Sequence, residues 1–164
     1  MDSVEAHNIG GQLLSQNDIG QSKTSSIQMA IANYTPGAIV NTYGQFDEGS
    51  YAMPIMILAV DNMHVRKIAF EKWYEYQKTN GNKAAPNILI DGRLEGEQGI
   101  IYALDSASDV KRWQKEWFPD EKISDGPCTM RSTSYNGAMI AANIVAIVNN
   151  KIANKKTGDN IREF

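Results

Sequence analysis

The chain of 164 residues contains a single cysteine, Cys128. One cysteine excludes both an intramolecular disulfide framework and a zinc ribbon built from several cysteines. There are only two histidines, His7 and His64, and neither has a partner at the spacing of a metal ligand pair. We therefore expect no structural zinc and no histidine metal centre.

The sequence also lacks a block of basic residues. It has 16 Lys and Arg against 19 Asp and Glu, and its formal net charge is -3. A nucleic-acid partner or an anionic membrane surface therefore has no electrostatic support. No apolar run reaches the ~18–20 residues of a membrane span, and the first residues do not form a signal peptide. These absences predict a soluble, cytoplasmic protein.

What the chain does contain is enough apolar material for a core, since 42% of its residues are hydrophobic and 21% are charged. Its length lies within the usual range of ~100–200 residues for one domain. Internal repeats, low-complexity tracts and linkers are absent from the sequence. We therefore predict a single domain over residues 1–164.

Alternating apolar patterns predict an α/β fold with a mostly parallel sheet. Residues 54–60 form a continuous apolar run, the pattern of a strand that is buried on both faces of a parallel sheet. Further strands are expected over 38–43, 87–90 and 99–104, and helices over 24–33, 63–78, 109–117 and 132–152.

The strongest candidate site follows the apolar run, where Asp61 and Asn62 precede the helix expected over 63–78. Ligands of open parallel sheets bind beyond the carboxyl ends of the strands. One interpretation is that Asp61 or Asn62 simply caps the helix. The other is that a carboxylate here holds Mg²⁺ against the phosphates of a nucleotide, with Arg66 as a clamp for phosphate or carboxylate.

Two further candidates each have a plain and a functional interpretation. Lys23 ends the run Asp18-Ile19-Gly20-Gln21-Ser22-Lys23, so it is either a solvated lysine after a turn or, with the following helix N-terminus, an anion-binding group. Cys128 precedes the last expected helix. It is either a small buried apolar residue or a thiolate that the helix dipole and Arg131 stabilise.

Taken in order, these segments resemble the ThiF/MoeB/ubiquitin-activating-enzyme superfamily. The family pattern reads V-E-x-x-N-L-x-R-Q, then D-I-G-x-x-K, then a strand ending in D-N and followed by R. The matching segments here are Asp2-Ser3-Val4-Glu5-Ala6-His7-Asn8-Ile9-Gly10-Gly11-Gln12, then Asp18 to Lys23, then Val60-Asp61-Asn62 with Arg66. Gly92 to Gly99, with the strand after it, resembles the family's next sheet crossing. The resemblance covers nearly the whole chain and implies a Rossmann-like three-layer fold.

The resemblance implies that the protein binds ATP and Mg²⁺ and adenylates a C-terminal carboxylate. The substrate would be a ubiquitin-like protein, a sulfur-carrier protein or a peptide, which reacts to an acyl-adenylate. By position, Asp61 would hold Mg²⁺ and Lys23 would contact the phosphates, while Asn8, Gln12, Asn62 and Arg66 would arrange nucleotide and substrate. Pro127-Cys128-Thr129 resembles the surroundings of the transfer cysteine that forms a thioester in some activating enzymes.

Three departures from the family pattern shape a second hypothesis. Gly11 stands where the family has an arginine, and the cysteine pairs that bind zinc are absent. The first strand, the G-x-G-x-x-G turn and the acidic residue that holds the ribose would all precede Met1. We therefore expect an N-terminally shortened member of the family. The alternative is a catalytically incomplete binding or partner subunit that needs another chain for ATP chemistry.

A nicotinamide- or flavin-binding Rossmann domain is a third hypothesis, and it has no motif in its favour. The family commonly dimerises, so a homodimer or a complementing subunit is expected as a partner. Trp113, Trp117 and Phe118 are either an interface patch or part of the core.

Overall fold

The computed structural model of the chain describes residues 3–9, 12, 14–80, 86–95, 98–122 and 134–157. The helices are α1 (Lys23–Tyr34), α2 (Met63–Asn80), α3 (Ala107–Glu116) and α4 (Ser134–Thr157), and three short 3-10 turns are η1 (Ala6–Asn8), η2 (Gln16–Asp18) and η3 (Asp120–Lys122). The strands are β1 (Ile55–Leu58), β2 (Ile88–Glu95) and β3 (Gln98–Leu104). The predicted α/β class is confirmed.

The three strands form one sheet in the order β1-β2-β3. β1 runs parallel to β2, with α2 between them in the chain, whereas β2 and β3 are antiparallel. The prediction of a mostly parallel sheet is therefore wrong, because the sheet is mixed. β2 extends to Glu95 and leaves two residues before β3, and a parallel connection needs a dozen residues or more.

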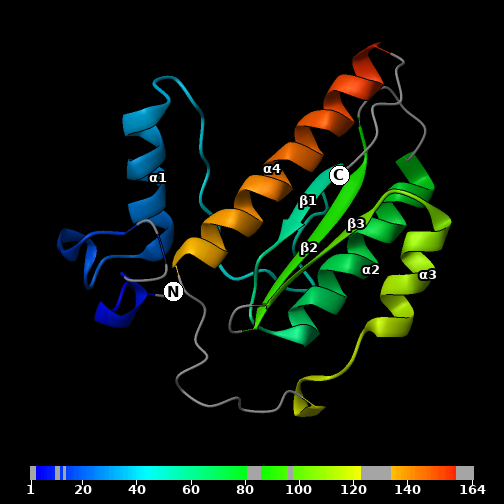
Figure 1. The fold of residues 1–164 in the computed structure, drawn as a ribbon, viewed down its shortest axis with the longest axis horizontal. Coiled ribbons are helices and arrows are strands. Elements are labelled where there is room, and N and C mark those ends of the chain that lie inside the picture. Colours follow the sequence, from blue (N-terminus) through cyan, green and yellow to red (C-terminus); the bar gives the residue numbers. More distant parts are fainter. Residues whose placement is uncertain are drawn as a thin grey trace.

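Helices cover both faces of this sheet (Figure 1). On one face, the three strands pack against α2 and α3 through the buried cluster Leu58, Ala69, Phe70, Trp73, Leu89, Tyr102, Leu104, Val110 and Trp113. On the other face, Ile88 and Ile90 of β2 pack against Ile144 of α4. The alternation of Ile88, Leu89 and Ile90 between the two clusters follows from the two-residue period of a strand.

Two glycines set how closely α4 approaches the sheet. A Cβ atom added at Gly92 would lie 3.1 Å from the Cδ1 atom of Ile144, and one added at Gly99 would lie 3.0 Å from the Cδ1 atom of Ile140. Both distances are shorter than ordinary van der Waals contact. Larger residues at these positions would therefore push α4 outward.

The segment before β1 is built differently. Val4 is buried, and its backbone N–H donates to the Gln21 carbonyl at 2.8 Å while its carbonyl accepts from Gly20 N–H at 2.9 Å. Gly20 has a φ of 82°, a conformation that favours glycine. The strand predicted over 38–43 is wrong, since this stretch has no regular secondary structure and pairs with no described strand, and Ile39 is 89% exposed.

Figure 1 draws α1 at the side of the molecule, away from α2 and α3. In the part of the chain that the structure describes, no helix has both the length and the hydrophobicity needed to cross a bilayer.

Candidate functional site

The turn between β1 and α2 carries Asp61 and Asn62. The Asn62 side chain caps α2, because its Oδ1 atom accepts from the Val65 N–H at 2.9 Å, and its carbonyl accepts from the Arg66 N–H at 3.1 Å. Asp61 is exposed, and no hydrogen bond to its carboxylate is recorded among the described residues. The capping role therefore belongs to Asn62, and Asp61 is exposed in the turn that follows the parallel strand β1.

A second carboxylate, that of Asp120 in η3, caps the N-terminus of α2. Its Oδ1 atom accepts from the Met63 N–H at 2.7 Å, and its Oδ2 atom accepts from the His64 N–H at 3.1 Å. The Trp117 indole N–H adds a bond to the Met63 carbonyl at 3.2 Å. The first turn of α2 already holds an anion, so its backbone amides are not open to a phosphate.

Arg66 fixes the backbone of the turn. It is 6% exposed, and its Nη2 atom donates to the carbonyl of Val60, the residue before Asp61. Its Nη1 atom donates to the Asp91 carboxylate and to the Gly92 carbonyl, the latter at 3.1 Å. Burial lowers the pKa of Arg66, and the charge of Asp91 opposes that shift. The guanidinium thus ties the turn to β2.

Asp91 of β2 is the centre of a buried ionic network. It is fully buried, and it pairs with Arg66, with Arg93 and with the Trp113 indole N–H, which donates to its Oδ2 atom at 2.8 Å. The Arg93 Nε atom donates to the same Oδ2 atom at 2.9 Å, and its guanidinium lies 4.5 Å from the centre of the Tyr102 ring. This network joins β2, α2 and α3 directly behind the turn.

Sequence reasoning missed Asp91, Arg93 and Asp120. Asp91 had a usable signal, because it follows the apolar residues of β2 just as Asp61 follows the apolar run that contains β1. Asp120 had none, since it lies 57 residues from the helix end that it caps.

Asn8 and Gln12 lie in the N-terminal segment. Asn8 is buried, and its Oδ1 atom accepts from the Glu5 N–H at 2.9 Å, while its carbonyl accepts from the Gln12 N–H at 3.0 Å. Gln12 is exposed. No recorded hydrogen bond joins Asn8 or Gln12 to Asp61 within the described residues.

Lys23 is the first residue of α1 and is half-buried. The structure thus places Asp61, Asn62 and Arg66 at one turn and the other three candidate residues, Asn8, Gln12 and Lys23, in the segment before β1. Cys128 and Arg131 lie outside the described residues, so the hypothesis of a transfer cysteine stays a prediction.

The two alternatives for the aromatic residues of α3 and its C-terminal extension are resolved for Trp113. It is 2% exposed and stacks on Phe70 with ring centres 4.2 Å apart, so it belongs to the core. Trp117 packs against the same cluster.

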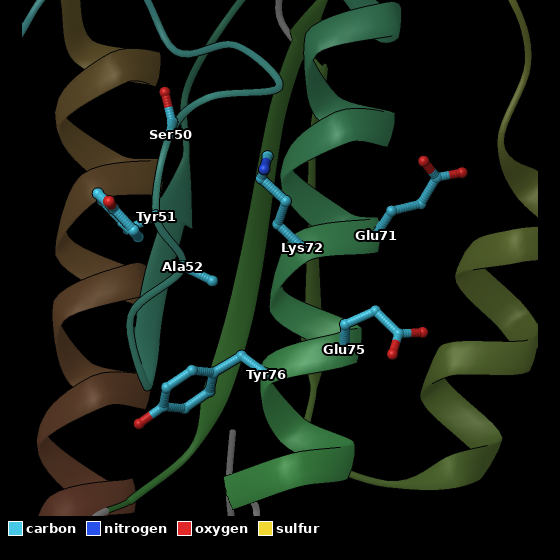
Figure 2. A pocket seen from close by; sticks show the side chains of 7 residues that line it. All are labelled: Ser50, Tyr51, Ala52, Glu71, Lys72, Glu75 and Tyr76. Atoms are coloured by element: carbon cyan, nitrogen blue, oxygen red, sulfur yellow. The ribbon is translucent and has the colours of Figure 1, made fainter.

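Two open hollows border α2. One of about 490 Å³ lies between the loop over 45–49 and the first turns of α2, which carry His64, Val65 and Ile68. The other, of about 480 Å³, lies between residues 50–52 and Glu71, Lys72, Glu75 and Tyr76 of α2. Figure 2 shows that Lys72 and Tyr76 project toward residues 50–52, whereas Glu71 and Glu75 project to the other side of α2.

No cluster of three or more His, Cys, Asp or Glu side chains that could hold a metal occurs among the residues described. A cation at Asp61 would therefore need ligands from a substrate and from water. Comparisons with protein-family models, with curated proteins and with solved structures found no match to this chain.

Proposed function

We propose that this chain is a Rossmann-like relative of the ThiF/MoeB activating enzymes. It acts in the ATP- and Mg²⁺-dependent adenylation of the C-terminal carboxylate of a ubiquitin-like protein, a sulfur-carrier protein or a peptide. The observation that carries the proposal is the exposed Asp61 carboxylate, which lies in the turn between the parallel strand β1 and α2 and is not the side chain that caps α2.

The anchoring of the turn supports this role. Arg66 holds the Val60 carbonyl, and Asp91 holds Arg66, so the backbone before Asp61 is tied to the central strand of the sheet. A ligand on a fixed backbone loses less conformational entropy when it binds than one on a mobile loop. The hydrogen bonds of the Arg66 guanidinium go to Asp91 and to the carbonyls of Gly92 and Val60, so we assign Arg66 a positioning role.

A single exposed carboxylate fits Mg²⁺. This ion keeps several waters and is usually bound through one or two carboxylates together with substrate phosphates. Asp61 would hold it, and the ion would neutralise part of the charge on the phosphates.

The reaction joins two anions. A carboxylate oxygen of the substrate attacks the α-phosphorus of ATP, and the bond from that phosphorus to the bridging oxygen breaks. Pyrophosphate leaves with the electron pair, and the product is the acyl-adenylate. Since the reactants repel each other, the protein must supply positive charge and positioning rather than a strong base. Lys23 is the residue that the resemblance assigns to the phosphates.

The test is a calorimetric titration of the full chain with ATP in the presence and absence of Mg²⁺. We expect wild type to bind ATP with Mg²⁺, and Asp61→Asn to weaken that binding about tenfold or more, since even the loss of an outer-shell partner weakens metal binding by about that factor. Glu71→Gln, which changes an exposed carboxylate further along α2, is the matched control and should bind like wild type. Equal affinity of wild type and Asp61→Asn would overturn the role of Asp61.

A partner subunit that leaves ATP chemistry to another chain is the second candidate. It is favoured by Asp120, which occupies the helix N-terminus next to Asp61 that could otherwise receive a phosphate. Under this hypothesis the purified chain alone does not bind ATP with Mg²⁺. The same titration therefore separates the two candidates.

The thioester hypothesis for Cys128 has its own test. If Cys128 accepts the acyl group, a covalent adduct with the substrate protein forms in the presence of ATP, is lost on treatment with a reducing thiol and is absent in Cys128→Ala. An unreactive thiol in the folded chain would exclude this step.

A further inference from the structure

The two hollows that border α2 adjoin each other and form one trough. The first lies beside the first turns of the helix, and the second lies beside its middle. The same stretch of chain lines both on the side opposite α2, with residues 45–49 at the first hollow and residues 50–52 at the second. Ile68 lines the first hollow and Lys72 the second, and these residues are about one helical turn apart. The trough therefore follows the axis of α2.

The first hollow combines apolar and acidic side chains. Its half-buried lining residues include Phe46, Val65 and Ile68. Asp47 and Glu48 line it too, and both are exposed. Within the described ranges, no recorded ion pair contains either carboxylate. Arginine and lysine have an apolar stem and a charged head, so this hollow suits a basic side chain.

The second hollow offers the opposite charge. Figure 2 shows that Lys72 and Tyr76 project toward residues 50–52. The two acidic residues of this hollow, Glu71 and Glu75, project to the other side of α2 and pair with other lysines. No ion pair of Lys72 is recorded in the part of the chain that the structure describes. Its ammonium group is therefore available to a carboxylate from outside the chain.

The separation of the two charged ends fits an extended peptide. His64 in the first hollow and Lys72 in the second are eight residues apart on α2, which corresponds to about 12 Å along the helix. In an extended peptide, side chains four positions apart project from the same face and are separated by about 13 Å. A basic and an acidic side chain at this spacing therefore reach both hollows at once.

We propose that the trough along α2 binds an extended segment of another protein in which a basic and an acidic residue are four positions apart. The basic side chain lies at Asp47 and Glu48, and the acidic one lies at Lys72. Charge complementarity identifies this partner, because the two ends of the trough carry charges of opposite sign. Such an arrangement fixes the register of the bound segment and disfavours segments of another pattern. This inference does not depend on the proposed ATP chemistry.

The test is fluorescence anisotropy of fluorescein-labelled decapeptides that are titrated with the full chain. Each peptide has one arginine and one glutamate in a background of serine and alanine, in either order and one to six positions apart. We expect the tightest binding at a separation of four. It should be about threefold tighter than at a separation of one, because only the wider spacing forms both ion pairs.

Exchange of charges between trough and peptide sharpens this test. Lys72→Glu should weaken the best peptide at least about fivefold, and replacing the peptide's glutamate with arginine should restore its binding. Lys111→Glu is the matched control, since it makes the same change in net charge at an exposed position of α3 outside the trough. It should bind like wild type.

Glu48→Lys covers the case in which Lys72→Glu fails to fold, because Glu48 is exposed. This variant should prefer a peptide with glutamate at both positions. Equal affinity of wild type for every separation would overturn the proposal. So would absence of binding, or equal weakening by Lys72→Glu and Lys111→Glu.

Discussion

The sheet with its covering helices and the segment before β1 are stabilised by different means. Around the sheet, large apolar side chains such as Trp73, Trp113 and Leu89 are fully or almost fully buried. In the described part of residues 3–54, only Val4, Asn8 and Ser26 are buried. Local hydrogen bonds, such as those from Ser15 to Asp18, hold the segment instead. Regions with few buried apolar contacts open at low free-energy cost.

The candidate residues are divided between these two regions. Asp61, Asn62 and Arg66 belong to the packed sheet, whereas Asn8, Gln12 and Lys23 belong to the segment before it. A ligand that binds both groups would stabilise the weaker region through its binding free energy. Under the proposed function, binding of such a ligand should therefore stabilise the segment before β1 more than the sheet.

The largest effect is expected at Asp91. Asp91→Asn removes the charge that Arg66 and Arg93 share inside the protein, and uncompensated buried charge costs about 3–5 kcal/mol of unfolding free energy. Urea unfolding followed by tryptophan fluorescence measures the loss. Asp18→Asn is the corresponding change in the N-terminal segment, where the carboxylate is exposed, and it should leave the midpoint almost unchanged. Equal losses of unfolding free energy in Asp91→Asn and Asp18→Asn would contradict the distinction between the two regions.

Truncation of apolar side chains sharpens the same comparison. Leu89 is fully buried in β2, so Leu89→Ala should cost about 2–5 kcal/mol. Met29 of α1 is 62% exposed, and Met29→Ala should stay within about 0.5 kcal/mol of wild type. If the two variants lose similar stability in urea, α1 is packed more tightly than the structure indicates.

The cap on α2 should have a smaller effect. Asp120→Ala leaves the backbone N–H groups of Met63 and His64 without their acceptor carboxylate, and loss of a helix cap costs about 1 kcal/mol of unfolding free energy. Thermal unfolding measures this loss.

The same variant also tests whether Asp120 blocks an anion site. Asp120→Ala exposes the backbone N–H groups of Met63 and His64, so it should bind inorganic phosphate more tightly than wild type. Unchanged phosphate binding would exclude such a blocking role.

The smallest effect concerns pH. The Tyr102 hydroxyl donates to Glu116 at 2.7 Å, and together with Arg112 this lowers the pKa of Glu116 below its ordinary value of 4.5. The folded state therefore gains stability above the ordinary pKa and loses it as the pH falls through the lowered one. The stability difference between wild type and Glu116→Gln should shrink below pH 4.5. A pH-independent difference would contradict this assignment.

Sequence reasoning succeeded where the signal was local and periodic. The helix predicted over 63–78 is α2, Met63–Asn80, and the run over 54–60 contains β1, Ile55–Leu58. Capping by Asn62 was one of two alternatives at the turn, and a cap depends only on the next few residues. These features follow from neighbouring residues alone.

It failed where distant residues decide the structure. β2 continues through Asp91 and Arg93 because Arg66 and Trp113, far away in sequence, pair with the Asp91 carboxylate. The stretch over 38–43 has the residues of a strand but no described strand beside it. No pattern within a short window contains this information.

Hydrogen exchange of the free chain and of the chain with ATP and Mg²⁺ tests the account most directly. It predicts that the amides of β2 exchange far more slowly than those of α1 in the free chain, and that ATP with Mg²⁺ slows exchange both around Asp61 and in α1. Equally slow exchange in α1 and β2 of the free chain, with no change on adding ATP and Mg²⁺, would contradict both the division into two regions and the site proposed between β1 and α2.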